Sequence, residues 1–476
     1  MPTIPKKANS ITAKNSANVL NSIKNEVGGT YADMIPYAIS EGDIMANGAR
    51  ATREDAVRSL RAIGNVMLEY QPLQNAFLSA LINRIAQVVV TSRLYENPWS
   101  GFKRGVLEYG ETIEEIFVQI ATPYQYDPVK AETEVFKRRI PDVKSAFHSM
   151  NYQKYYPTTV SREQLHQAFL SYEGVSDLIN RIIEQIYTGA NYDEFIVMKY
   201  MIAREALNGD IYSVNIEAPT ADNARSITSQ MVTYAKNLGF MSTKFNAAGV
   251  NTYSDITSLY MILTTEISSI FDVEVLALSF NMNKAELLGR QIYVDGFGTF
   301  DNDRLALIFA DDPYTTFTPF TKEEMTELSN IQGLMVDKDW FMIYDNLYNT
   351  TEIYNPQGLY WNYFYHVWKT FSTSPFSNAI LFTTSTPGVT SVTVTPGSQT
   401  IQKGQSAKFS AAVVTTGLAP KNVTWKLTGT ETVTSTVDET GTVTIASEEA
   451  NTTLTLTATS VFDGEKTGTA TITVGS

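Results

Sequence analysis

Residues 175–207 read VSDLINRIIEQIYTGANYDEFIVMKYMIAREAL and carry the strongest helical pattern in the chain. From Leu178 to Ile202, apolar residues recur at intervals of three and four, the spacing of a buried helix face. Asn208-Gly209 then provides a common type of helix end. A continuous helix here would span about 50 Å at roughly 1.5 Å per residue. We therefore predict a long spine helix, with Gly189 as a position where it could break.

The segments before the spine predict an arm and shorter helices. Residues 1–50 are polar and rich in Gly and Asn, as expected of an extended or partly ordered arm. Thr52 with Asp55, and Ser161 with Gln164, have the spacing of residues that cap helix starts. The predicted helices of this part are 52–72, 73–92 and one that opens at Ser161.

The region from Tyr95 to Thr159 is predicted to be an extended loop. Its prolines, at positions 98, 123, 128, 141 and 157, exclude a long helix. We predict strands at Ile113–Ala121 and Val143–Tyr152, with the charged run Lys130–Arg139 between them. Because such an excursion has little core of its own, we expect it to lean on something else, such as a neighbouring subunit.

The segments after the spine predict a mixed lobe. Two have helical spacing, and three short apolar runs are typical of strands. The predicted helices are Asp222–Leu238 and Ser254–Phe271, and the predicted strands are Val273–Phe280, Gln291–Val294 and Leu305–Ala310. The fold class of residues 1–385 is therefore α+β.

The composition changes near residue 386. Threonine supplies 25 of the 91 residues from Thr386 to Ser476, and its branched Cβ favours strands over helices. Apolar residues alternate with polar ones through six or seven short segments separated by turn signals. Ser385-Thr386-Pro387-Gly388 is the natural linker. We predict a separate all-β sandwich over residues 387–476, with Trp425 filling its core.

The composition also excludes several classes of chemistry. The chain has no cysteine, which excludes disulfides, thiolate metal sites and cysteine nucleophiles. A net charge of −14 argues against a general nucleic-acid-binding surface. No apolar segment follows Met1 as in a signal peptide, and no apolar run approaches roughly 18 residues. We expect a soluble product of the cytoplasm, with no membrane span.

Two loop motifs are candidate ligand sites. Asp295-Gly296-Phe297-Gly298 lacks the third glycine and the following helix of a dinucleotide-binding loop. A nearby acidic group offers the oxygen ligands that Mg²⁺ and Ca²⁺ prefer, although its spacing fits no calcium motif. A surface loop or a subunit contact is the alternative interpretation of this group, which consists of Asp301, Asp303, Asp311 and Asp312.

The remaining candidates have a structural interpretation as well. The three histidines, His148, His166 and His366, lie far apart without a partner pattern, and we interpret each as structural. The aromatic block Tyr360–Trp368 could stack on sugars or pack in a core or an interface. Lys137-Arg138-Arg139 is interpreted as an inter-subunit salt-bridge partner. We assign no catalytic, cofactor-binding or metal-binding residue and expect no enzymatic activity.

The C-terminal segment resembles the group 2 bacterial immunoglobulin-like domains over its whole length. The resemblance implies a β-sandwich that is displayed on surfaces, and it implies no ligand. The matching residues are Val392-x-Val394-x-Pro396, Gly404, Phe409, Val423-x-Trp425, Val437-Asp438-x-x-Gly441-x-Val443 and Ala470-x-Ile472-x-Val474.

The order of segments in residues 1–385 resembles the tailed-bacteriophage major capsid proteins of the Hong Kong-97 type. In that fold an arm precedes an extended loop, a long spine helix and an α+β lobe. The corresponding segments here are about 1–50 for the arm, about 95–159 for the loop and about 175–207 for the spine. Ile292-Tyr293-Val294-Asp295 and Leu305–Asp311 resemble the late strands of such proteins. With the immunoglobulin-like domain, the combination resembles capsid proteins of small short-tailed phages.

This resemblance implies a shell protein that assembles with itself into pentamers and hexamers. It implies a scaffolding protein and a portal as partners, and enclosure of double-stranded DNA without sequence-specific binding. The C-terminal domain would then be available for host contact. Three rival hypotheses remain. The chain could be a bacterial surface-layer or adhesion protein, a phage tail or fibre protein, or a metal-dependent enzyme that uses the Asp301 group.

Overall fold

The computed structural model describes most of the chain. The described residues are 17, 20, 21, 24 and 25, then 33–69, 96–108, 112–121, 123, 126–128, 143–170, 174–274, 291–310, 312–313, 317–430 and 435–475. The predicted helix 73–92 and the basic run Lys137–Arg139 lie outside them.

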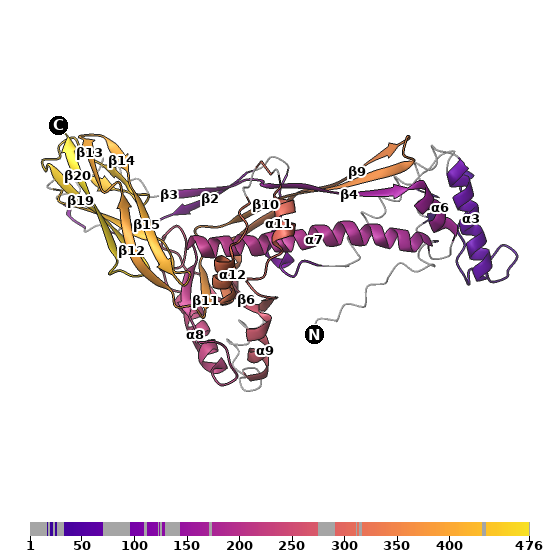
Figure 1. The fold of residues 1–476 in the computed structure, drawn as a ribbon, viewed down its shortest axis with the longest axis horizontal. Coiled ribbons are helices and arrows are strands. Elements are labelled where there is room, and N and C mark those ends of the chain that lie inside the picture. Colours follow the sequence, from indigo (N-terminus) through magenta and orange to yellow (C-terminus); the bar gives the residue numbers. More distant parts are fainter. Residues whose placement is uncertain are drawn as a thin grey trace.

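A single long helix, α7 (Gly174–Asn208), runs through the centre of the molecule (Figure 1). Its 35 residues confirm the predicted spine, and Gly189 does not interrupt it. Met198 and Ile202 are completely buried in the main core. Helices α3 (Arg53–Glu69) and α6 (Arg162–Leu170) lie at one end of α7, and the C-terminal strands lie at the other end (Figure 1).

The two predicted helix starts are confirmed by their capping bonds. At the start of α3, the Thr52 amide donates to Asp55 Oδ2 at 2.9 Å, and the Asp55 amide donates to Thr52 Oγ1 at 3.3 Å. At the start of α6, Ser161 and Gln164 exchange the same pair of bonds at 3.0 and 3.2 Å. These reciprocal bonds satisfy amides that have no partner within the helix.

Part of the predicted arm packs against the chain's own body. Ala17 and Leu20 are buried in the main core, and Ile35 and Ala38 join them there. Asn21 fixes this contact, because its side chain accepts from the Ala38 amide at 2.8 Å and donates to the Ala38 carbonyl at 2.9 Å.

A four-stranded sheet lies along the spine. The sheet contains β1 (Lys103–Val106), β9 (Phe341–Asn355), β10 (Tyr360–Thr373) and β4 (Tyr152–Ser161), in the order β1-β9-β10-β4. A short 3-10 turn, η1 (Ser100–Phe102), directly precedes β1 in the chain. Its inner face packs on α7 with Trp361, Tyr363 and Val367, which are almost completely buried. The predicted strand Val143–Tyr152 ends earlier, at His148, and β4 begins at Tyr152.

A five-stranded sheet and its helices form the lobe, in the order β5-β11-β8-β6-β7. The strands are β5 (Tyr212–Asn215), β6 (Leu259–Thr264), β7 (Gln291–Val294), β8 (Ile331–Asp337) and β11 (Ala379–Thr383). The helices are α8 (Ala224–Asn237), α9 (Thr265–Glu274), α11 (Asn302–Ile308) and α12 (Lys322–Ser329), with 3-10 turns η2 (Ile256–Ser258) and η4 (Lys338–Trp340). This observed mixture confirms the predicted α+β class, and helix 222–238 and strand 291–294 are confirmed within it.

Three predictions for the lobe are wrong, wholly or in part. The predicted helix Ser254–Phe271 is correct only from Thr265, where α9 begins, because Leu259–Thr264 is strand β6, whose residues are buried on both faces and therefore do not alternate. Leu305–Ala310 belongs mostly to helix α11, because Asp301 caps its start by accepting from the Arg304 amide at 2.9 Å. Val273 and Glu274, the start of a predicted strand, end helix α9, and 275–280 lie outside the described residues.

In its described residues, 387–430 and 435–475, the C-terminal segment contains nine short strands and its own hydrophobic core. They are β12 (Gly388–Thr395), β13 (Ser398–Gln402), β14 (Ser406–Lys408), β15 (Ser410–Thr416), β16 (Val423–Thr428), β17 (Thr436–Val437), β18 (Thr442–Thr444), β19 (Thr453–Ser460) and β20 (Thr467–Gly475). Phe409, 1% exposed, fills the centre of the core. The prediction for Trp425 is wrong in this respect, since Trp425 is half-buried and packs at the edge of the core.

Candidate assembly surfaces

A two-stranded hairpin projects from the body beside the C-terminal strands (Figure 1). It pairs β2 (Ile113–Val118) with β3 (Val143–His148) in antiparallel register. One face is anchored to the end of β10 and to Ser374 just beyond it. Glu115 accepts from Ser374 Oγ at 2.8 Å and lies 3.3 Å from His148 Nε2, and His148 Nδ1 lies 2.8 Å from Ser372 Oγ. His148 therefore has a structural position in this anchor.

The opposite face of the hairpin presents apolar side chains to solvent. Ile116, Val118, Val143 and Phe147 are 58%, 56%, 51% and 66% exposed. Val118 and Val143 are direct cross-strand partners, whereas Ile116 is paired with Ser145 and Phe147 with Glu114, so the four apolar side chains share this face with one hydroxyl and one carboxylate. We call these four residues the hairpin strip. Exposed apolar surface of this kind marks protein–protein contact sites.

The outer face of the four-stranded sheet carries a second strip, which consists of aromatic side chains. Residues of the aromatic block alternate along β10, so Trp361, Tyr363 and Tyr365 face the core while Phe364, His366 and Trp368 are only half-buried. Tyr155 of β4 is 58% exposed, and its ring centroid lies 5.7 Å from that of Phe364 and 5.9 Å from that of His366. We call Tyr155, Phe364, His366 and Trp368 the sheet strip.

A buried ionic network holds this sheet on the spine. Lys369 of β10, 3% exposed, contacts Glu194 of α7 and lies 2.9 Å from Asp345 of β9. Lys103 of β1 contacts the same two carboxylates at 3.4 and 3.0 Å, and Tyr348 donates to Asp345 at 2.7 Å. Burial disfavours the charge of Asp345, but Lys369 and Lys103 outweigh it and hold the pKa of Asp345 below its usual value. The positive charges of Lys103 and Lys369 therefore balance the negative charges of Glu194 and Asp345 within this network.

A second polar cluster ties α11 and β4 to the spine. Arg304 forms a two-pronged ion pair with Asp193 at 2.7 and 3.0 Å. Tyr156 donates to the same carboxylate at 2.8 Å, and Tyr152 lies 2.9 Å from Tyr156 through their hydroxyl oxygens. Asp193 and Glu194 are adjacent buried carboxylates in a helix whose other buried residues, apart from Lys199, are mostly apolar. That interruption was the sequence signal for both clusters, because buried carboxylates require partners.

The structure disperses the predicted acidic group. Asp301 caps α11, Asp303 is exposed in its first turn, and Asp312 pairs with Lys154 at 2.6 Å. Asp311 lies outside the described residues. Among the residues that the structure describes, no three His, Cys, Asp or Glu side chains gather as a metal site would require.

The other predicted candidates also have identifiable positions. Asp295, at the start of the glycine loop, pairs with the buried Lys199 at 2.7 Å, and Phe297 is buried in the main core. His166 is exposed on α6, and His366 lies 3.1 Å from Thr351 Oγ1 through its Nε2.

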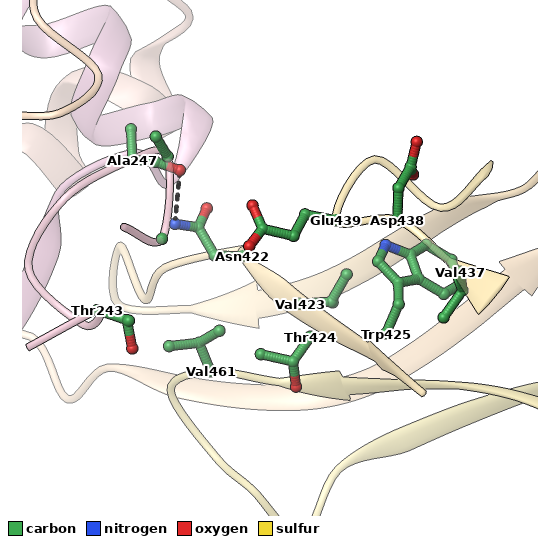
Figure 2. A pocket seen from close by; sticks show the side chains of 12 residues that line it. Thr243, Ala247, Asn422, Val423, Thr424, Trp425, Val437, Asp438, Glu439 and Val461 are labelled. Carbon is green, nitrogen blue, oxygen red and sulfur yellow. Dashed lines mark hydrogen bonds between the residues drawn. The ribbon is translucent and has the colours of Figure 1, made fainter. Parts of the chain in front are cut away.

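The C-terminal segment and the body line an open pocket of about 490 Å³ (Figure 2). Lys144 of the hairpin is the link that sequence reasoning missed. Its ammonium donates to the Ala248 carbonyl of the body at 3.1 Å and pairs with Glu439 of the C-terminal segment. Asn422 adds a bond to the Ala247 carbonyl at 3.2 Å, drawn as a dashed line in Figure 2. Body, hairpin and C-terminal segment therefore meet at one point.

Comparisons with known proteins identify the class of this chain. The major capsid protein of Bacillus phage B103 is 34% identical over 93% of this chain and 89% of its own length. The major capsid protein of Bacillus phage PZA is 31% identical over 92% of this chain and 88% of its own length. The solved capsid structure of Staphylococcus phage Andhra aligns with a TM-score of 0.45 at 16% identity, covering 60% of this chain and 84% of that one. The curated relatives define the class, which is the phage major capsid protein.

Residues 20–383 match the family model described as Phi29-like phage major capsid protein, and the chain belongs to this family. The predicted function, a structural subunit of the virion capsid, is therefore confirmed. Within the described residues, no helix is long and apolar enough to cross a membrane.

Proposed function

We propose that the chain builds pentamers and hexamers of a Hong Kong-97-type shell, and that the hairpin strip docks on a second copy of the chain. The exposed apolar strip on β2 and β3 carries this proposal. Its four side chains are at least half exposed in the single chain. Fully burying one such side chain contributes about 1.5–3 kcal/mol, a gain available to every copy in a shell.

The sheet strip is the proposed receiving surface. It is flat and aromatic, and aromatic rings are enriched where subunits meet. A contact between two different patches joins subunits head to tail and closes into rings, which is the geometry that pentamers and hexamers require. The ionic networks beneath the strip hold β4 and β10 against the spine, and they therefore keep the receiving face rigid.

The remaining partners follow from this role. We propose a scaffolding protein and a portal as assembly partners, and double-stranded DNA as the enclosed cargo. The net charge of −14 supports enclosure of DNA without tight binding. We further propose that residues 387–476 are a group 2 bacterial immunoglobulin-like domain on the outside of the shell, and that the chain performs no catalysis.

Assembly of purified chain, with and without a scaffolding protein, tests the docking of the hairpin strip. We expect rings or closed shells of the natural sequence in electron microscopy and light scattering. Phe147→Ser should reduce the yield of shells at least tenfold, because the largest side chain of the strip is lost while the fold keeps its core. Val414→Ser is the matched control, since Val414 is 54% exposed on the C-terminal strand β15.

Two results would overturn the proposal. One is a natural chain that stays monomeric under every assembly condition. The other is unchanged shell yield for Phe147→Ser, provided that circular dichroism and thermal unfolding show both variants to be folded like the natural chain.

A further inference from the structure

The open pocket between the body and the C-terminal segment has the lining of a ligand site (Figure 2). One wall is the body loop that contains Thr243 and Ala247, and the other is β16 with the loop around Asp438. Its volume of about 490 Å³ lies within the roughly 300–1,000 Å³ of small-molecule sites in proteins. The pocket is therefore large enough for a small organic ligand.

Contacts on several sides hold the two walls at a fixed separation. The Asn422 side chain donates to the Ala247 carbonyl at 3.2 Å, and Lys144 joins the same two walls. Lys421, the residue before Asn422, donates its ammonium to the Leu207 carbonyl at 2.8 Å, at the end of α7. A ligand therefore meets a preformed pocket and loses little free energy in ordering it.

The indole of Trp425 gives the pocket a flat aromatic surface. The side chain is half-buried and lines the pocket. Gly441 lies directly against its six-membered ring, because Gly441 has a φ of +82° and a Cβ there would be 2.8 Å from Trp425 Cζ2. Among the described residues, nothing accepts a hydrogen bond from the indole N–H. The ring is therefore fixed in place and offers both an apolar face and a free donor.

Two side-chain oxygens of the pocket are free acceptors among the residues that the structure describes. Asp438 receives three hydrogen bonds from two threonines of its own loop, all on Oδ1, which leaves Oδ2 unused. Asn422 uses its amide nitrogen for Ala247 and leaves Oδ1 unused. The side chains of Thr243 and Thr424 add hydroxyl groups to the lining.

This lining fits one class of ligand better than the others. The carboxylates of Asp438 and Glu439 repel an anion. Lys144 already pairs with Glu439, and Trp425 is the one ring among the lining residues, so they form no aromatic cage for a quaternary ammonium group. A purely apolar ligand would leave the free donor and acceptors without partners. A neutral sugar has an apolar C–H face for the ring and hydroxyl groups that both donate and accept.

We propose that this pocket binds a neutral oligosaccharide that carries an N-acetyl group. One sugar ring stacks on Trp425, and the acetyl carbonyl accepts from the indole N–H. The hydroxyl and amide hydrogens of the sugar donate to Asn422 Oδ1 and Asp438 Oδ2. The site goes beyond the proposed shell assembly, because both of its walls belong to a single chain.

Saturation-transfer nuclear magnetic resonance on the unassembled full chain tests the site without depending on shell formation. A trisaccharide of N-acetylglucosamine should bind with a Kd in the millimolar range, and maltotriose, which lacks acetyl groups, at least fivefold more weakly. Thr243→Tyr should weaken binding at least tenfold, because the added ring fills the pocket from the body wall. Ser229→Tyr is the matched control, since Ser229 is exposed on α8 and does not line the pocket.

Two substitutions of the indole separate stacking from hydrogen bonding. Trp425→Ala should weaken binding at least tenfold, whereas Trp425→Phe keeps a ring without the N–H and should weaken it about threefold. Circular dichroism establishes that each variant is folded. A natural chain that does not bind the N-acetylglucosamine trisaccharide would overturn the proposal, even if that chain forms shells. So would unchanged affinity of Thr243→Tyr, or displacement of the sugar by choline chloride, which would identify a cation site.

Discussion

Lys369 joins the four-stranded sheet to the spine helix, because its ammonium contacts carboxylates of both. It reaches Glu194 and Asp345 from β10, and both carboxylates are removed from solvent by the same packing. Removing one partner from a buried ion cluster leaves the others without compensation, which costs more than the cluster contributes when complete.

We therefore expect Lys369→Met to lower the free energy of unfolding by about 3 kcal/mol. Urea denaturation of the unassembled chain, followed by tryptophan fluorescence, measures this loss. Lys408→Met is the control, because Lys408 is exposed on β14 and its loss should change stability by less than about 0.5 kcal/mol. Equal midpoints for the two variants would show that Lys103 alone balances the two carboxylates.

At the scale of elements, Gly189 of α7 and Gly64 of α3 have opposite roles. A Cβ at Gly189 of α7 would meet its nearest neighbours at 3.8 Å, which is ordinary contact. A Cβ at Gly64 of α3 would lie 2.6 Å from Phe169 Cβ, too close for any side chain. Gly64 therefore permits α3 to approach α6, while Gly189 costs the spine conformational entropy without a packing benefit.

Gly189→Ala should stabilise the spine by about 0.5–1 kcal/mol and raise the unfolding temperature. Gly64→Ala should lower that temperature, because α3 must move away from Phe169. Differential scanning calorimetry of the two variants provides the comparison. A lower unfolding temperature for Gly189→Ala would mean that the spine needs flexibility at its centre.

The elements that sequence alone predicts are those fixed by local rules. The spine, the capped starts of α3 and α6, and the hairpin strands follow from spacing and short-range bonds. Strand β6 was mistaken for a helix because a strand buried on both faces loses its alternation. Helix α11 was mistaken for a strand because its seven residues are too few to display a helical period.

The candidate surfaces could be predicted only in part. The sequence predicted that the loop leans on something else, and the described hairpin does contact the chain's own body through Glu115, His148 and Lys144. Contact with a neighbouring subunit stays a prediction. The sequence also predicted that the block Tyr360–Trp368 packs in a core or an interface, and its alternate residues are in the core. It could not indicate that Lys144 meets Glu439, because that pair joins positions nearly three hundred residues apart along the chain. The partners of Glu194, Lys103 and Lys369, are hidden for the same reason.

At the scale of the whole molecule, the C-terminal segment contacts both the hairpin and the spine. Lys144 reaches Glu439 from the hairpin, and Lys421 reaches the end of α7. A domain with these two contacts is placed to set the geometry of the subunit as well as to face outward. We therefore favour a role in which this segment stabilises the shell, which we call a clamp, over a role limited to display on the outer surface, which we call a knob.

Deletion of residues 387–476 distinguishes the two roles. If the domain is a clamp, the remaining chain should give fewer shells, and these should open at lower temperature than natural shells. Light scattering during heating and electron microscopy measure both effects. Intact shells of unchanged stability that lose only adsorption to host cells would identify the domain as a knob.

The alternation along β10 also limits how this protein can change in length. Insertion of one residue into Tyr360–Val367 would turn Trp361 and Tyr363 toward solvent and bring Phe364 and His366 into the core. Substitutions can be accepted one at a time along this strand, but insertions and deletions cannot. Within β9 and β10, changes in length are therefore expected only at the exposed tip Pro356–Gly358. A peptide inserted at that tip should leave the packing of both strands on the core unchanged.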